Sequence, residues 1–228
     1  MAGGLVAEVK YKGSSDSLRE SDYQAEQIDV LNELYRVTKP GGYIFYNHKL
    51  RWLKGTMIHP MEWIAKSKWD IRQEIIWDRG IAANIRGWRF WQIEERVYWM
   101  QKGIQVGEEI LSKHAKMSSI WKIRPESRFP EHPAPFPLEF PTRCIYCMFD
   151  NANGLNVLDP YCGTGTTLVA AKILGHNYVG IDICPDYQSL FQNRLTDLTE
   201  VRIVEDEKRL HVVEKSYAER KKLKLSES

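Results

Sequence analysis

The stretch VLDPYCGTGTTLVAAKILGHNYVGIDICPDY, residues 157–187, decides the fold predicted for this chain. An apolar strand runs into an Asp-Pro pair, a glycine-rich turn opens a helix of small residues, and a second apolar segment ends at Asp182. Gly163 and Gly165 allow backbone amides to approach a ligand closely, and the helix N-terminus favours a carboxylate or a phosphate. This order of elements is typical of half of a nucleotide-binding α/β fold.

The same stretch narrows the choice of ligand. An acid at the end of the second strand, here Asp182, typically accepts the ribose hydroxyls of an adenosine cofactor. A Walker A loop is excluded because no Gly-Lys-Ser or Gly-Lys-Thr follows the glycines. A dinucleotide fingerprint would have a third glycine at position 168, where this chain has Leu168. A nicotinamide-dependent oxidoreductase is therefore a disfavoured alternative.

Composition places the chain among ordinary globular proteins. Its 228 residues are 43% hydrophobic and 27% charged, with a net charge of +2, so they can bury a sizeable core. No apolar run approaches the roughly 18–20 residues of a membrane span, and no signal pattern opens the chain. We therefore expect a cytoplasmic protein that does not contact a membrane.

The four cysteines indicate no disulfide framework in a chain of this length. Cys144 and Cys147 have a metal-like spacing, but one such pair does not make a zinc site. Buried thiols are the preferred interpretation, and no metal is predicted.

Hydrophobic periodicity and turn signals predict the order of the elements. A helix should open at Ser21 and Gln24, which have capping-box spacing, and should stop at Lys39-Pro40-Gly41-Gly42. The other predicted helices and strands are strand 43–47, a helix around 59–67, strands 71–77 and 96–100, helix 138–149, strand 156–158 and a helix ending near 174. The tail after residue 197 is expected to be a solvated helix or a frayed end.

Cations and aromatic residues alternate between Arg79 and Lys102, where only Glu94 and Glu95 are acidic. Such alternation is typical of a surface that meets phosphates and bases. Alternatively, the aromatic rings fill a core and the arginines extend from it, and both interpretations stay open. On the nucleic-acid interpretation, we expect Arg79, Arg86 and Arg89, together with the basic segment 113–128, to face DNA.

Three ordered motifs carry a family resemblance. DPYCGTGTT (159–167) resembles the S-adenosylmethionine loop of the DNA amino-methyltransferases, which act on adenine N6 or cytosine N4. HPAPFP (132–137) resembles the second cofactor segment of this family, which precedes the loop in the permuted β-class order. ELYRVTKPGGYIFYNHK (33–49) resembles the elements after the catalytic tetrad, and RQEIIWDRG (72–80) and ERVYWMQKG (95–103) resemble the next two strands. The resemblance spans roughly residues 15–200 and explains why the cofactor half lies near the C-terminus.

The resemblance implies a Rossmann-like α/β methyltransferase fold, with a mixed, mostly parallel sheet and helices on both faces. It implies one domain over residues 1–228: a substrate half (1–103), a variable target-recognition-like segment (104–131), a cofactor half (132–200) and a charged tail (201–228). It implies S-adenosylmethionine as cofactor, DNA as partner and a homodimer. The cofactor-binding residues carried over from the family are Phe136, Pro137, Asp159, Tyr161, Gly163, Gly165, Thr166, Thr167 and Asp182.

The catalytic tetrad of the family, Asp/Asn/Ser-Pro-Pro-aromatic, is missing. Its polar groups accept hydrogens from the target amine and its ring stacks on the flipped base. None of the ten prolines of this chain is next to another. We therefore name no catalytic residue and expect the chain to begin just downstream of the tetrad, with Leu5–Val9 or another chain filling the missing strand. The alternative is a catalytically inactive nucleic-acid-binding relative that keeps the cofactor pocket.

Overall fold

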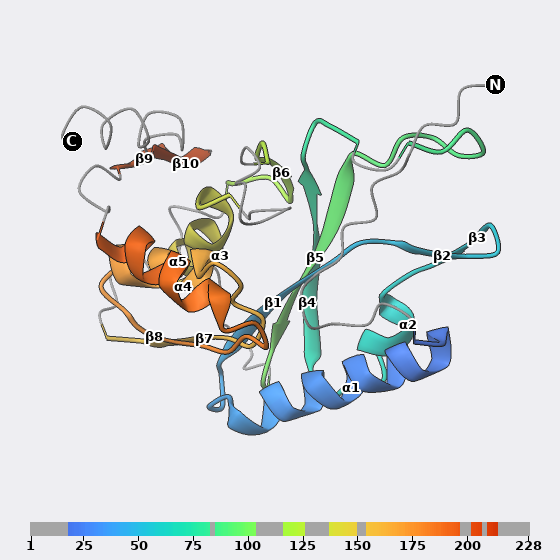
Figure 1. The fold of residues 1–228 in the computed structure, drawn as a ribbon, viewed down its shortest axis with the longest axis horizontal. Helices are drawn as coiled ribbons and strands as arrows, with labels where there is room; N and C mark the ends of the chain where they lie inside the picture. Colours follow the sequence, from blue (N-terminus) through green and yellow to red (C-terminus); the bar gives the residue numbers. More distant parts are fainter. Residues whose placement is uncertain are drawn as a thin grey trace. The chain divides into compact units, whose positions relative to one another are not determined.

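A computed structural model describes residues 18–82, 85–103, 116–125, 137–149, 154–196, 202–206 and 209–213. The chain divides into two compact units, one made mainly by residues 17–124 and the other mainly by residues 125–206. Both units combine helices with strands, as Figure 1 shows along the chain from blue to red. The predicted α/β class is confirmed, while the single domain over residues 1–228 stays a prediction.

The first unit opens with α1 (Glu20–Val37), the helix predicted from its apolar periodicity. The helix ends at Thr38, two residues before Pro40, because the residue preceding a proline disfavours helical geometry. The predicted capping box of Ser21 and Gln24 is wrong. The helix already includes both residues, its N-cap makes no side-chain hydrogen bond, and Gln24 Nε2 donates to Glu20 Oε1 at 3.1 Å instead.

A four-stranded sheet forms the centre of this unit, in the order β1-β5-β4-β6. Its strands are β1 (Tyr43–His48), β4 (Asp70–Asp78), β5 (Glu94–Gln101) and β6 (Ile120–Lys122). β5 pairs antiparallel with both β1 and β4, and β6 pairs parallel with β4. The sheet is therefore mixed, as predicted, although antiparallel pairings are the majority in this unit. β4 and β5 are consecutive in the chain and are joined by residues 79–93.

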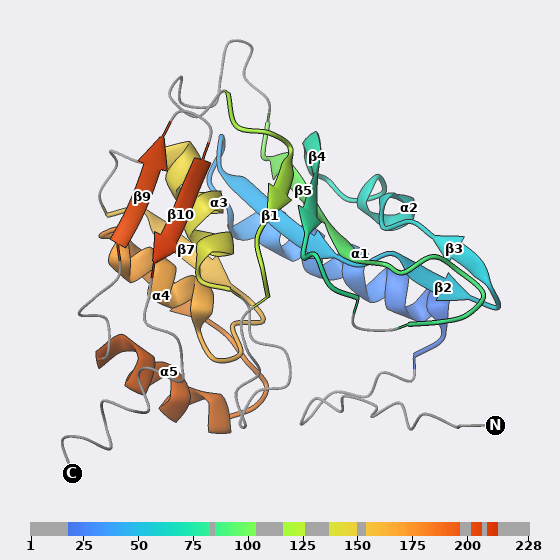
Figure 2. The same cartoon turned by 90° about the horizontal axis from the view of Figure 1, so that it is seen from above.

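One face of this sheet carries the main core of the unit. Leu31 of α1, Trp63 of the short helix α2 (Met61–Ile64), and Tyr98 and Met100 of β5 are fully buried in one cluster. Trp69 Nε1 donates to the backbone carbonyl of Leu31 at 2.7 Å, so this indole is buried with its own donor satisfied. In Figure 1, α1 runs across the lower ends of β4 and β5, and in the view from above it lies beneath β1 (Figure 2).

The hairpin formed by β2 (Arg51–Leu53) and β3 (Thr56–Ile58) was not predicted from the sequence. Its turn is Lys54-Gly55, and both residues have positive φ, 50° and 82°. Two consecutive left-handed residues match the twist of a two-residue hairpin. The hairpin extends away from the four-stranded sheet in Figure 1.

The second unit contains the nucleotide-binding arrangement that the sequence predicted. It consists of α3 (Glu139–Phe149), β7 (Asn156–Asp159), α4 (Thr166–Ile173), β8 (Asn177–Gly180) and α5 (Asp186–Thr196). β7 and β8 are parallel, and α4 connects and contacts both. Leu138, Val169 and Ala170 form the small core of this unit, with Phe191 packed against it.

The segment after residue 197 differs from its prediction. β9 (Arg202–Asp206) and β10 (Arg209–Val213) form a two-stranded sheet, where a solvated helix or a frayed end was expected. Short apolar runs alternate with charged residues in this segment, so the charges hide the strand pattern. Among the described residues, no helix is both long enough and apolar enough to cross a membrane.

Candidate functional site

The glycine loop between β7 and α4 is held by backbone hydrogen bonds at both of its ends. The Ile181 amide donates to the Asp159 carbonyl at 2.9 Å, and the Cys162 amide donates to the Ile181 carbonyl at 2.9 Å. Gly163 and Gly165 have φ of 49° and 77°, which is the left-handed region that glycine adopts without strain. The loop is therefore fixed against the end of β8 before any ligand binds.

The Asp182 carboxylate connects the glycine loop to the segment that follows β8. Its Oδ2 accepts a hydrogen bond from the Gly163 amide at 2.8 Å, and its Oδ1 accepts one from the Cys184 amide at 2.8 Å. An ionised carboxylate has about four acceptor positions, so each oxygen can take one more donor. The acid predicted to bind ribose thus lies beside the glycine loop with acceptor capacity left over.

Helix α5 also packs on the loop, through two residues that sequence reasoning missed. A side chain at Gly165 would meet the Phe191 ring at 2.2 Å, so the ring closes directly over this glycine. Arg194 Nη1 donates to Thr166 Oγ1 at 2.6 Å and approaches Thr164 Oγ1 at 3.4 Å. The only sequence signal for this contact was that Phe191 and Arg194 are three residues apart, and so on one face of the helix that follows Asp182.

The structure brings most of the predicted cofactor residues together. Asp159, Gly163, Gly165, Thr166 and Asp182 all lie in or beside the loop through the contacts above, and Thr167 follows in the first turn of α4. The Tyr161 amide donates to Asp159 Oδ1 at 3.0 Å, and its ring is 63% exposed.

The second predicted cofactor segment is described only at its end. Pro137 is buried, and its carbonyl accepts the Phe140 amide at 3.1 Å, just before α3 begins. Phe136 lies outside the described residues.

The cysteine of the loop, Cys162, is held in its protonated form. Burial raises the pKa of the Cys162 thiol to about 11, and the nearby Asp159 and Asp182 carboxylates add to this shift. The thiol is therefore protonated at neutral pH and presents no competing anion to a ligand carboxylate. All four cysteines are free, and no group of three or more potential metal ligands occurs among the described residues.

Asn47 and His48, at the end of β1, are candidates for a catalytic role because no tetrad is present. Asn47 Nδ2 donates to the Arg96 carbonyl at 3.1 Å, which ties it to the neighbouring strand. His48 Nδ1 lies 2.6 Å from the Lys49 carbonyl, so this nitrogen carries the hydrogen, and Nε2 accepts from the Tyr23 hydroxyl at 2.6 Å. Burial lowers the pKa of His48 to about 4, so the ring is neutral with its lone pair engaged. Neither side chain is available as a catalytic base.

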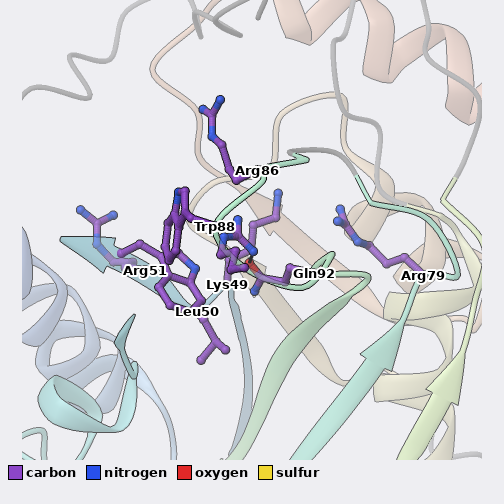
Figure 3. A pocket seen from close by; sticks show the side chains of 9 residues that line it. Lys49, Leu50, Arg51, Arg79, Arg86, Trp88 and Gln92 are labelled. Carbon is purple, nitrogen blue, oxygen red and sulfur yellow. Dashed lines mark hydrogen bonds between the residues drawn. The ribbon is translucent and has the colours of Figure 1, made fainter. Parts of the chain in front are cut away.

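The arginines predicted to face DNA line one pocket of the first unit (Figure 3). We call this site, with a cavity volume of about 460 Å³, the cationic pocket. It is lined by Lys49, Leu50, Arg51, Trp52, Arg79, Arg86, Trp88, Arg89 and Gln92. The end of β1, the hairpin and the segment between β4 and β5 therefore meet here.

The three arginines differ in their surroundings. Arg79 Nη1 lies 2.8 Å from Glu95 Oε1, and its side chain is only 11% exposed. Arg86 and Arg89 have no carboxylate partner among the described residues. Arg86 and Arg89 are thus better placed than Arg79 to meet an external anion.

The chain is similar in sequence to known DNA methyltransferases. The sequence pattern of the N6/N4 DNA methylase family matches residues 8–193. The type II methyltransferase M2.DpnII of Streptococcus pneumoniae is 25% identical over 214 residues, which cover 85% of this chain and 75% of that protein. M.Cfr9I of Citrobacter freundii is 25% identical over 141 residues, which are 58% of this chain. The matched region spans 46% of the length of M.Cfr9I and 28% of that of M.BglI of Bacillus subtilis, well under two thirds of either.

Solved structures agree on the fold. The cytosine-N4-specific PvuII DNA methyltransferase superposes with a TM-score of 0.68 at 17% identity, covering 85% of this chain and 77% of that one. TTHA0409 of Thermus thermophilus, solved in complex with S-adenosyl-L-methionine, superposes with a TM-score of 0.58 at 23% identity, covering 77% of each chain. The predicted Rossmann-like methyltransferase fold is confirmed, and the match over residues 8–193 shows that this chain belongs to the N6/N4 DNA methylase family.

Proposed function

We propose that this chain binds S-adenosylmethionine and serves in transfer of its methyl group to an exocyclic amine of DNA, adenine N6 or cytosine N4. The observation that carries the proposal is the Asp182 carboxylate hydrogen-bonded to the Gly163 amide, beside a glycine loop that opens α4. This geometry occurs in a chain of the N6/N4 DNA methylase family. A role within restriction–modification is the corresponding biological setting.

The methionine part and the adenosine part of the cofactor differ in chemistry, and the site contains groups suited to each. The amide groups of the glycine loop and the Thr166 and Thr167 hydroxyls suit the carboxylate of the methionine part. The remaining acceptor positions of Asp182 suit the ribose hydroxyls. Pro137 and Phe136 supply apolar surface suited to the adenine. When bound, the cofactor supplies an electrophilic methyl group; the chain's own part is to hold and orient it.

DNA is proposed as the substrate on the strength of the family and of the cationic pocket. Arg86 and Arg89 lie there without carboxylate partners among the described residues, and Arg79 joins them as a cation held by Glu95. We also propose a cytoplasmic protein, in keeping with its free cysteines, and a homodimer, which sedimentation at several concentrations would test.

The second candidate function is a nucleic-acid-binding relative that keeps the cofactor pocket without turnover. It is favoured by the absence of adjacent prolines and by the engagement of Asn47 and His48 in structural contacts. Losing a group that polarises the reacting atom typically lowers the rate by about 10²–10³-fold, and here no such group was found. We expect residues 1–228 alone to bind the cofactor with negligible turnover.

A methyl-transfer assay with labelled cofactor and mixed-sequence DNA tests both candidates. Residues 1–228 are compared with the same chain preceded by a segment that carries a Pro-Pro-aromatic tetrad. Turnover restored by the added segment supports the methyltransferase. Binding of cofactor without turnover in either protein supports the inactive relative, and robust turnover by residues 1–228 alone would show that a catalytic group has been missed.

A further inference from the structure

The cationic pocket contains more hydrogen-bond donors than acceptors. Five cations line it, and two carboxylates reach them: Glu95, within 2.8 Å of Arg79 and 3.4 Å of Lys49, and Glu20, 3.0 Å from Arg51. Four lining side chains also hold a buried donor with no acceptor among the described residues, namely Trp52 Nε1, Arg79 Nε, Arg89 Nε and Gln92 Nε2. The lining therefore suits an acceptor-rich, anionic ligand.

Aromatic rings form the other half of the pocket. The Arg89 guanidinium lies 4.9 Å from the ring centroid of Trp52 and 5.7 Å from that of Trp88. The two indoles meet edge to face at 5.1 Å, which orders all three groups before a ligand arrives. In Figure 3, Trp88 lies between Arg51 on the left and Arg79 on the right, and the Arg86 guanidinium points to the top, away from the other labelled side chains.

The ring of Trp88 remains 54% exposed although it lines a pocket. Phe90 and Trp91 follow on the same segment and are exposed to 98% and 64%. A folded protein rarely leaves several large rings together in solvent unless they meet a ligand. A contact with phosphates alone would need the cations but not the rings.

We propose that the cationic pocket binds an unpaired nucleotide of a DNA strand. Its phosphate is held by Arg86 and Arg89, and its base stacks on Trp88. The inference rests on the proposed DNA substrate and adds the state of that substrate, because the base faces in a closed duplex are covered by their neighbours. The volume of about 460 Å³ lies in the range of small-ligand sites.

Three fluorescently labelled or competing probes separate the ring contribution from the charge contribution. They are a labelled single-stranded oligonucleotide and a fully paired duplex of the same sequence, both titrated by fluorescence anisotropy, and inorganic polyphosphate, which is titrated as a competitor. Trp88→Leu should weaken single-strand binding about 5- to 150-fold, the range for losing one base–ring stack. It should leave polyphosphate competition unchanged, because the cations remain. Trp88→Phe keeps a ring and should restore most of the affinity.

Trp91→Leu is the matched control, because Trp91 is exposed on the same segment but does not line the pocket. A smaller loss for Trp91→Leu than for Trp88→Leu supports the assignment. Equal losses for single strand and polyphosphate, or no effect of Trp88→Leu, would reduce the site to a phosphate contact and overturn the proposal. So would tight binding of an apolar peptide at the expense of the oligonucleotide.

Calorimetry with S-adenosylmethionine keeps this test apart from the proposed function. Trp88→Leu should bind the cofactor as the wild type does, because Trp88 and the glycine loop belong to different units. If the wild type binds the cofactor and Trp88→Leu binds single strands normally, only the inference about the pocket fails. If the wild type binds no cofactor, the proposed function fails whatever the oligonucleotides show.

Discussion

The glycine loop and the cationic pocket are both built where strands end, but they satisfy their polar groups in opposite ways. In the loop, the Asp182 carboxylate accepts hydrogen bonds from two backbone amides, and Arg194 donates one to the Thr166 hydroxyl. In the pocket, Arg86 and Arg89 have no carboxylate among the described residues, and Trp88 keeps half of its surface exposed. The polar groups of the loop are largely hydrogen-bonded within the chain, whereas the pocket keeps cations without carboxylate partners among the described residues and an exposed ring. This difference points to a small, geometrically demanding ligand at the first site and a long polyanion at the second.

The packing of α5 against the glycine loop can be tested by replacing Gly165, with Gly87 as the control. Gly165→Ala places a side chain within 2.2 Å of Phe191 at a residue with φ of 77°, so we expect a loss of about 2–4 kcal/mol of unfolding free energy. Gly87→Ala is the control in the open region, with nothing within 4 Å, and should change stability by less than about 0.5 kcal/mol. Urea unfolding followed by circular dichroism measures both. A tolerated Gly165→Ala would mean that α5 does not close over the loop as described.

Acid should weaken the first unit through His48, next to the cationic pocket. Its pKa is about 4 in the folded chain and about 6.5 when unfolded, so the unfolded chain takes the proton first. The stability contributed by the neutral ring is fully present above pH 6.5 and is lost as the pH falls towards 4. The slope contributed by this residue is at most about 1.4 kcal/mol per pH unit.

Tryptophan fluorescence during urea unfolding measures this slope, because all eight tryptophans lie between residues 52 and 121. His48→Gln should flatten the slope between pH 6.5 and 4. Tyr23→Phe removes the hydroxyl that donates to His48 but leaves the titrating ring, so a slope should remain. An unchanged slope in His48→Gln would contradict the pKa assignment.

The two regions should also respond differently to salt. If Arg86 and Arg89 contact phosphates, log affinity for DNA falls linearly with log salt, with a slope near −0.9 per phosphate neutralised. Replacing both by alanine should flatten the slope by between about one and two units. Arg36→Ala, an exposed arginine of α1 paired with Glu33, should leave the slope unchanged. DNA affinity that ignores salt would make these arginines structural.

The glycine loop was easier to predict from the sequence than the cationic pocket, because its residues are close together in the chain. The loop, its flanking strands and Asp182 were predicted because the φ demands of Gly163 and Gly165 and the strand–helix–strand order fall within one continuous stretch. The pocket could be predicted only as a basic and aromatic composition. Its walls need the Lys54-Gly55 hairpin turn, which the sequence analysis missed because the strands are three residues long.

Contacts across longer separations were also missed. Arg194 and Phe191 reach the loop from α5, and a periodicity argument does not say which residue of a helix meets which glycine. The antiparallel pairing of β5 with β1 and β4 was not predicted either, because apolar strands show that they are buried but not which way they run.

Calorimetric titration with S-adenosylmethionine of the wild type, Asp182→Ala and Asp186→Ala tests the central claim most directly. Asp182→Ala removes the proposed ribose acceptor and the acceptor of the Gly163 amide, and it should weaken binding by about 1–3 kcal/mol. Asp186→Ala removes a nearby acid in the first turn of α5 and should bind as the wild type does. Equal affinity for all three proteins, or tight binding of NAD by the wild type, would contradict the assignment of this loop to S-adenosylmethionine.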